Sequence, residues 1–189
     1  MHHTFFLAGL AAASTLAAAS PLESRQSKCH PSFGGVGVAV VWDQSTFVPR
    51  EWVPVAVGDS ITTDYAEYNT VAFRVEGVTS PTGSYVIKKL GVPANNEVVS
   101  VGGGYLNIAY ASATDPNQTW EISCDTCGTS PSTTHGLFAS GCTIKSVNLG
   151  LCAQIVTSPT HAHSPPSFLS QLVTCNAAAT NQRFQFWTV

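Results

Sequence analysis

The sequence reads Asn117-Gln118-Thr119-Trp120 in mid-chain and Asn181-Gln182-Arg183-Phe184-Gln185-Phe186-Trp187 near its end. In both stretches an Asn-Gln pair leads directly into a segment that carries a large aromatic residue. A pattern of this kind that occurs twice in one chain indicates a repeated supersecondary unit rather than one irregular domain. The two stretches therefore predict a fold built from repeats, each closed by this motif.

The rest of the chain has the sequence pattern that is typical of short strands. Apolar and β-branched runs alternate with turns rich in Gly, Pro, Asn and Ser, which is typical of strands joined by tight connections. Beyond the first 20 residues, no window keeps the 3.6-residue apolar period over the length of a helix. The sequence therefore predicts an all-β chain, with strands in the runs Val36 to Trp42, Trp52 to Val57, Val71 to Val75, Tyr85 to Ile87, Val98 to Val101 and Tyr105 to Tyr110.

Three comparable blocks can be laid out along this chain. The first runs from about Cys29 to Gly77 and closes at Asn69 to Phe73, the second runs from Thr82 to Cys124, and the third begins at Gly141. Three repeats of four short strands make the β-trefoil plan, in which the units close one barrel together because no unit alone can bury its apolar face. We therefore predict an all-β, disulfide-stabilised β-trefoil of three four-strand repeats.

The first 20 residues are predicted to be a signal peptide. Phe5 to Ala13 is apolar, and the small residues Ala17-Ala18-Ala19-Ser20 that follow are typical of a cleavage site. The apolar run is shorter than the roughly 20 residues that cross a bilayer. We expect a secreted, extracellular protein with a signal peptide over 1–20, a short N-terminal segment over 21–28, a single domain over 29–189 and no membrane span.

The charge and composition of the chain argue against some classes of binding partner. Lys and Arg number 8 against 11 for Asp and Glu, which gives a formal net charge of -3, and no basic run could follow a phosphate backbone. We therefore expect no nucleic-acid partner. Hydrophobic residues make up 44% of the chain and charged residues 10%, which is too apolar for an intrinsically disordered protein and fits a compact domain.

Six cysteines all follow the predicted signal peptide, and disulfides persist in the extracellular space. Cys124-Asp125-Thr126-Cys127 has the spacing of a redox motif or of half a zinc site. It has no βαβ pattern around it and no second CxxC, so a structural role is favoured. Six cysteines allow 15 connectivities, and their spacing alone does not choose among them.

The third block resembles the ricin B-type lectins. Its Gly150-Leu151-Cys152-Ala153-Gln154-Ile155 is similar to the Gly-x-Cys-x-Asp-Val stretch of that family, and Leu172-Val173-Thr174-Cys175 is similar to its Leu-Trp-x-Cys stretch. Asn181 to Trp187 resembles the family's closing Gln-x-Trp motif. The resemblance implies a disulfide between Cys152 and Cys175, and the general pattern also resembles small secreted fungal proteins with this fold.

The resemblance also implies where a sugar would bind. The family uses a carboxylate, a stacking aromatic ring, and an Asn or Gln of the closing motif, each for a different part of the sugar. The first two positions match Gln154 and Val173 in the third block, and Ser100 and Ile108 in the second, so neither block has the carboxylate or the ring. The candidate ligand-binding residues are Gln154, Asn181, Gln182, Asn117 and Gln118, while a structural role, in which the Gln amide holds the loop before the strand, is the stronger interpretation of the closing motifs.

Other motifs predict no further chemistry. His161-Ala162-His163, with His135 as a third ligand, is more typical of a solvated loop than of a metal site, because Pro residues flank it. The carboxylates of the first block fit scattered surface charges better than a glycosidase pair: Asp43, Glu51, Asp59, Asp64 and Glu67. We expect no enzyme activity, catalytic residue, cofactor or metal. Asn117-Gln118-Thr119 is also an N-glycosylation sequon.

Two functions of different class remain. The first is a secreted carbohydrate-binding, lectin-like protein with a degenerate sugar site, whose partner is a glycan. Exposed aromatic rings would offer such a protein another stacking surface, with Trp42, Trp52, Tyr65, Tyr68, Tyr105 and Tyr110 as candidates. The alternative is a non-lectin, protein-binding trefoil, such as a protease inhibitor or secreted effector, that contacts an extracellular protein through a loop such as Thr157 to Ser167.

Overall fold

The computed structural model describes residues 28–42, 49–66, 72–79, 81, 83–91, 96–129, 134–157 and 168–188. Several sequence predictions fall outside these residues. They are the signal peptide over 1–20, the closing segment Asn69 to Val71, the residues Asp43, Glu67 and Tyr68, the His161-Ala162-His163 motif, and the loop over 158–167.

The described residues form an all-β structure, as predicted. The strands are β1 (Gly37–Trp42), β2 (Arg50–Val53), β3 (Thr62–Tyr65), β4 (Phe73–Gly77), β5 (Ser84–Lys89), β6 (Glu97–Gly102), β7 (Tyr105–Tyr110), β8 (Trp120–Ser123), β9 (Thr126–Cys127), β10 (Gly136–Ser146), β11 (Cys152–Thr157), β12 (Phe168–Val173) and β13 (Phe184–Thr188). Two short 3-10 turns, η2 (Pro116–Gln118) and η3 (Thr180–Gln182), contain the two Asn-Gln pairs.

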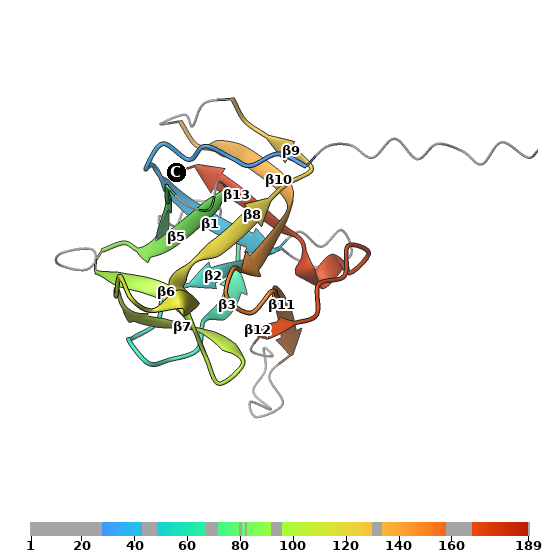
Figure 1. Ribbon diagram of the computed structural model, residues 1–189. Coiled ribbons are helices and arrows are strands. Elements are labelled where there is room, and N and C mark those ends of the chain that lie inside the picture. Colours follow the sequence, from blue (N-terminus) through green and yellow to red (C-terminus); the bar gives the residue numbers. More distant parts are fainter. Residues whose placement is uncertain are drawn as a thin grey trace, which may run out of the picture.

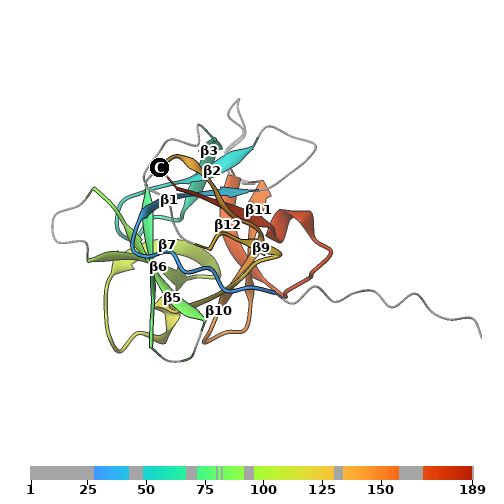
Figure 2. The same ribbon diagram turned by 90° about the horizontal axis from the view of Figure 1, so that it is seen from above.

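All the strands belong to one antiparallel sheet that closes on itself. Following the pairings from β1 through β13, β10, β8, β5 and β4 leads back to β1. Closure leaves fewer exposed strand edges than an open sheet of the same length. The strands β1, β5, β8, β10 and β13 lie together around one end of the molecule in Figure 1, and the view from above in Figure 2 shows the strands arranged around a common centre.

The prediction of a β-trefoil of three four-strand repeats is wrong. The described strands form a single 13-stranded sheet, whose order does not divide into three groups of four. Strand β9 has no place in a four-strand plan, and the 11-residue β10 pairs with β8, β9, β11 and β13. The prediction failed because local motifs near the ends of two blocks carry no information about which distant strands pair.

The closing aromatic residues lie in the core. Along β13, Phe184 and Phe186 are buried and alternate with half-buried residues, as expected for a strand with one face toward the core. Trp120 of β8 is fully buried, and its indole Nε1 donates to the carbonyl of Val99 at 3.1 Å. Phe33 packs its ring against Phe186, with ring centroids 4.9 Å apart. The aromatic half of each closing motif is therefore a packing element.

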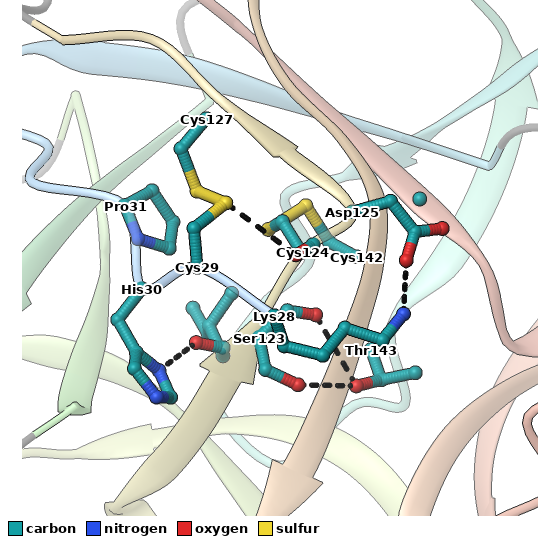
Figure 3. The surroundings of a disulfide bond; sticks show 12 residues. Lys28, Cys29, His30, Pro31, Ser123, Cys124, Asp125, Cys127, Cys142 and Thr143 are labelled. Atoms are coloured by element: carbon teal, nitrogen blue, oxygen red, sulfur yellow. Dashed lines mark hydrogen bonds and ion pairs between the residues drawn. A yellow bond between two sulfur atoms is a disulfide. The ribbon is translucent and has the colours of Figure 1, made fainter. Parts of the chain in front are cut away.

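Three disulfides link the six cysteines: Cys29–Cys127, Cys124–Cys142 and Cys152–Cys175. The bond between Cys152 and Cys175, which the family resemblance implied, is present. Both cysteines of the CxxC motif are bonded to partners outside it, which confirms its structural role. Figure 3 shows the first two disulfides side by side, where the chain around Cys29 crosses β9 and β10.

Candidate functional site

The glutamines of the two closing motifs make the same backbone hydrogen bonds. Gln118 Oε1 accepts from the amide of Ser112 at 2.8 Å, and its Nε2 donates to the carbonyl of Tyr110 at 2.8 Å. Gln182 Oε1 accepts from the amide of Asn176 at 2.8 Å, and its Nε2 donates to the carbonyl of Thr174 at 3.2 Å. Both glutamines are buried, so each fixes the loop that precedes its strand.

The predicted ligand-binding residues of the third block lie together, but they bond mainly to the protein itself. Gln182 Nε2 also donates to Gln154 Oε1 at 3.1 Å, so the Gln182 amide has partners on both its oxygen and its nitrogen. Asn181 Nδ2 points to the carbonyl of Ile155 at 3.4 Å. Val173, at the position of the family's stacking ring, is half-buried in β12. The two positions of the third block that match the family's carboxylate and stacking ring thus carry neither group.

In the second block the two matched positions are in the core. Ser100 and Ile108 are both buried, in β6 and β7. Asn117 is the middle residue of the η2 turn. Asp115 caps this turn, and its Oδ1 accepts from the Asn117 amide at 2.9 Å, while Asn117 Oδ1 accepts from Asn148 at 3.0 Å. The sugar subsite that the resemblance places at Ser100 and Ile108 therefore has no access to solvent.

An open groove lies beside Asn117 to Trp120, the closing motif of the second block. Its volume is about 450 Å³, and the end of β4, the outer part of β5 and the loop after β7 form its walls. Its lining combines apolar side chains with two carboxylates, one ammonium group and two hydroxyls. The lining residues are Glu76, Gly77, Val78, Val86, Lys88, Val98, Ala111, Ser112, Ala113, Asp115, Gln118 and Thr119.

Internal bonds hold the charged groups of this groove in place. Lys88 Nζ lies 2.6 Å from Glu76 Oε2, and both side chains remain partly exposed. Asp115 is held through its Oδ1, as described above, while Ser112 Oγ lies 3.2 Å from Thr114 Oγ1. Gln118 fixes the backbone of Ser112 and Tyr110 and so shapes one wall of the groove. Because its side-chain amide makes these two bonds, we do not count it among the groups that bind a ligand.

A second hollow of about 440 Å³ adjoins the first. Glu76, Gly77 and Val78 line both hollows, so together they run along the end of β4. His30 and Tyr85 line the far part. His30 Nδ1 lies 2.9 Å from the carbonyl of Ile122, and the Tyr85 hydroxyl donates to the carbonyl of Pro31 at 2.8 Å. Burial of the Tyr85 phenol raises its pKa above the ordinary value of 10.0.

No metal-binding cluster is assembled in the part of the chain that the structure describes. No group of three or more His, Cys, Asp or Glu side chains in these ranges could hold a metal ion. His135 stacks near Trp187, with ring centroids 5.8 Å apart. Of the carboxylates named from the sequence, Glu51 is buried in β2, whereas Asp59 and Asp64 are exposed.

Across the residues that the structure describes, no helix has both the length and the apolar character needed to cross a membrane.

The sequence reasoning missed most of the groove. Only Gln118 among the predicted site residues lines it. The other residues come from segments that strand pairing brings together, since β4 and β5 pair along their length and β5 also pairs with β8. Glu76 and Lys88 are ordinary surface charges in the sequence, and only the antiparallel register of β4 and β5 places them side by side.

Known proteins resemble this chain in fold, and none of the matches places it in a family. No family model matches the chain, and no curated protein matches it. Solved structures with a similar fold include the cytolethal distending toxin from Actinobacillus actinomycetemcomitans, at 17% identity with a TM-score of 0.52, which covers 81% of this chain and 90% of that one. The Haemophilus ducreyi cytolethal distending toxin matches at 14% identity and a TM-score of 0.52, over 81% of this chain and 82% of that one.

A Caenorhabditis elegans protein of unknown function also matches, at 7% identity and a TM-score of 0.52, over 87% of this chain and 97% of that one. Because these matches span most of each chain, they concern the fold as one unit rather than a single repeat. None of the three is named as a ricin B-type lectin. Likeness at such identities shows the fold alone, since one fold hosts many functions.

Proposed function

We propose that the protein is a secreted carbohydrate-binding protein and that its saccharide lies in the groove beside Gln118. The observation that carries this proposal is the open groove itself, in which Glu76, Lys88 and Asp115 stand around a partly apolar floor. The three disulfides are consistent with secretion. The proposal keeps the lectin-like function expected from the sequence and moves its site.

The polar groups of the groove suit sugar hydroxyls. A carboxylate accepts hydrogen bonds from two neighbouring hydroxyls, and these charge-assisted bonds are stronger than neutral ones. Glu76 and Asp115 supply such acceptors, and Lys88 supplies donors. Because Lys88 already holds Glu76 in one position, the ligand does not have to order that carboxylate on binding.

The floor of the groove suits the apolar face of a pyranose ring. Val78 and Val86, which are both half-buried, are among its lining residues, whereas no aromatic side chain is among the described residues that line it. Without a stacking ring, the contact with one sugar unit is weak, and we expect single monosaccharides to bind with dissociation constants of about 1 mM or weaker. Tighter binding requires several sugar units along the combined hollows. The proposal assigns binding, and no catalytic step, to these residues.

A glycan-array screen of the mature, oxidised protein tests this proposal. The double variant Glu76→Gln, Asp115→Asn keeps the size of both side chains and removes both charges, and we expect it to lose the glycan signal. The matched control is Gln154→Ala, Asn181→Ala in the third block, which should bind as the wild type does. Loss of signal only in the control, or the absence of signal from every glycan with the wild type, would overturn the proposal.

The second candidate function is the binding of an extracellular protein, and one observation favours it. Val147 and Leu149 are both exposed in the turn between β10 and β11. The turn is well fixed, because Val147 donates its amide to the carbonyl of Thr119 at 3.0 Å and Leu149 donates its amide to Ser146 Oγ at 3.2 Å. Exposed apolar side chains on a fixed turn are typical of protein contacts. Capture of a purified secreted protease by the wild type, but not by Val147→Ser, Leu149→Ser, would favour this function.

A further inference from the structure

Arg50 is a buried cation enclosed by aromatic rings. Only 8% of the residue is exposed, although arginine is rarely buried without a charged partner. Its guanidinium carbon lies 4.2 Å from the centre of the Phe168 ring and 4.7 Å from the centre of the Tyr65 ring. Trp42, the cross-strand neighbour of Arg50, stands beside Phe168 with ring centroids 5.9 Å apart. Cation–π contacts of this kind hold the guanidinium in one orientation.

The hydrogen-bond donors of Arg50 are not used by the described residues. No hydrogen bond or ion pair of its guanidinium is found in these ranges, whereas the carbon makes two ring contacts. None of its nitrogen atoms is among the fully buried, unpartnered atoms of the described residues, and 8% of the residue is exposed. A guanidinium carries five N–H donors in a fixed plane. Arg50 therefore holds oriented donors that no described residue uses.

The nearest carboxylates in the strand pairing cannot serve as partners. Glu51 and Asp64 are directly opposite each other in β2 and β3, and Arg50 is opposite Tyr65. Successive side chains of a strand point to opposite faces, so Glu51 and Asp64 stand on the other face of this hairpin from Arg50. The face with Arg50 is thus aromatic and cationic, and no carboxylate among the described residues forms an ion pair with Arg50.

We propose that Arg50, Tyr65 and Phe168 form a binding site for a sugar acid, a pyranose that carries a carboxylate. The planar guanidinium fork matches a carboxylate and binds it through two parallel hydrogen bonds. Tyr65 is 47% exposed, so much of its ring remains open to the apolar face of a pyranose. This site is separate from the groove beside Gln118 and does not depend on the function proposed for that groove.

Calorimetric titration at low salt, with sodium D-galacturonate as the probe, tests this site. The comparison probes are methyl galactoside, which lacks the carboxylate, sodium acetate, which lacks the ring, and inorganic phosphate. We expect galacturonate to bind more tightly than each of the three. In Arg50→Gln its dissociation constant should rise at least about tenfold, the effect of losing one charge-assisted bidentate pair.

Two variants separate the geometry of the fork from its charge. Arg50→Lys keeps the charge and loses the planar fork, so its affinity for galacturonate should also fall. Lys145→Gln removes a charge that is paired with Glu121 on the surface, and it should leave the affinity unchanged. Near-ultraviolet circular dichroism confirms that each variant is folded.

Three results would overturn the site. They are equal binding by the wild type and Arg50→Gln, binding of acetate or phosphate as tight as that of galacturonate, and loss of galacturonate binding in the groove variant Glu76→Gln, Asp115→Asn. The last result would show that galacturonate binds in the groove beside Gln118 and not at Arg50. The glycan array would then test the groove alone.

Discussion

Gln118 and Gln182 each bond to backbone groups that stand six and eight residues earlier in the chain. In both places the side-chain oxygen takes an amide hydrogen and the side-chain nitrogen donates to a carbonyl. A buried side chain that bonds both to an amide and to a carbonyl of an exposed loop is difficult to replace, because its removal leaves two backbone groups without these partners. The Gln of each closing motif is therefore a loop clamp.

Replacement of either clamp should destabilise the protein. We expect Gln118→Ala and Gln182→Ala each to lower the free energy of unfolding by about 1–3 kcal/mol, because each removes two hydrogen bonds that fix a loop. Urea unfolding of the oxidised protein measures this. Gln154→Ala is the control, since Gln154 only accepts from Gln182, and its effect should be under about 1 kcal/mol. An unchanged midpoint for Gln182→Ala would contradict the clamp.

The Cys29–Cys127 disulfide should contribute more stability than Cys152–Cys175. The first joins residues 98 apart and the second joins residues 23 apart. The loop-entropy model then gives about 4.7 and about 3.4 kcal/mol for the two crosslinks. We expect the Cys29→Ser, Cys127→Ser variant to melt at a lower temperature than Cys152→Ser, Cys175→Ser. The reverse order would show that loop length does not set their relative contribution.

Tyr85 should make stability fall in alkaline solution. Burial raises the pKa of Tyr85 above 10.0, so the unfolded chain loses this proton before the folded chain does. The contribution is complete below pH 10.0 and is lost as the pH rises toward the folded pKa. Tyr85→Phe lacks this titration, but it also loses the hydrogen bond to Pro31.

At about pH 7 we therefore expect Tyr85→Phe to be less stable than the wild type by about 1 kcal/mol, and this difference should shrink at about pH 11. Denaturant unfolding at the two pH values measures it. A difference that stays constant, or grows, with rising pH would contradict the assignment.

Gly141 should not tolerate a side chain. Its φ of 61° is in the left-handed region, and a Cβ atom would collide with the Asp125 carboxylate. Asp125 is bonded to Lys28, as Figure 3 shows, and its Oδ2 lies 3.3 Å from Arg183. Gly141→Ala should therefore cost about 1–3 kcal/mol of stability, from backbone strain and displacement of Asp125.

Gly150 provides the matched control for this substitution. Its φ is 68°, but nothing lies within 4 Å of a Cβ atom built there, so Gly150→Ala bears the backbone cost without the collision. Thermal melts of the two variants compare these effects. Equal melting temperatures would show that the Asp125 side chain can move away from the new Cβ atom without loss of stability.

The sequence predicted the local features of this molecule well. The strands over the runs Val98 to Val101 and Tyr105 to Tyr110, and the structural role of Gln118, follow from residues close together in the chain. The Cys152–Cys175 bond followed from the family resemblance. These features depend on local side-chain chemistry or on a pattern within one block, and a sequence displays both directly.

The sheet topology and the groove could not be predicted in this way. The pairing of β10 with four strands, and the insertion of β9, depend on distant segments that carry no matching local motif. Glu76 and Lys88 become neighbours only through the register of β4 and β5. Arg50 is an ordinary surface charge in the sequence, and only the fold places it between Tyr65 and Phe168.

Whether a saccharide binds in the groove beside Gln118 is tested best by mapping backbone amide shifts by NMR, on the isotope-labelled mature protein titrated with the strongest glycan from the array. If the saccharide lies in the groove, the largest changes occur at Ser112, Asp115 and Thr119, with little change at Gln154 and Asn181. Shifts concentrated at Gln154 and Asn181, or saturation without any change around Ser112, would show that the saccharide does not bind in the groove.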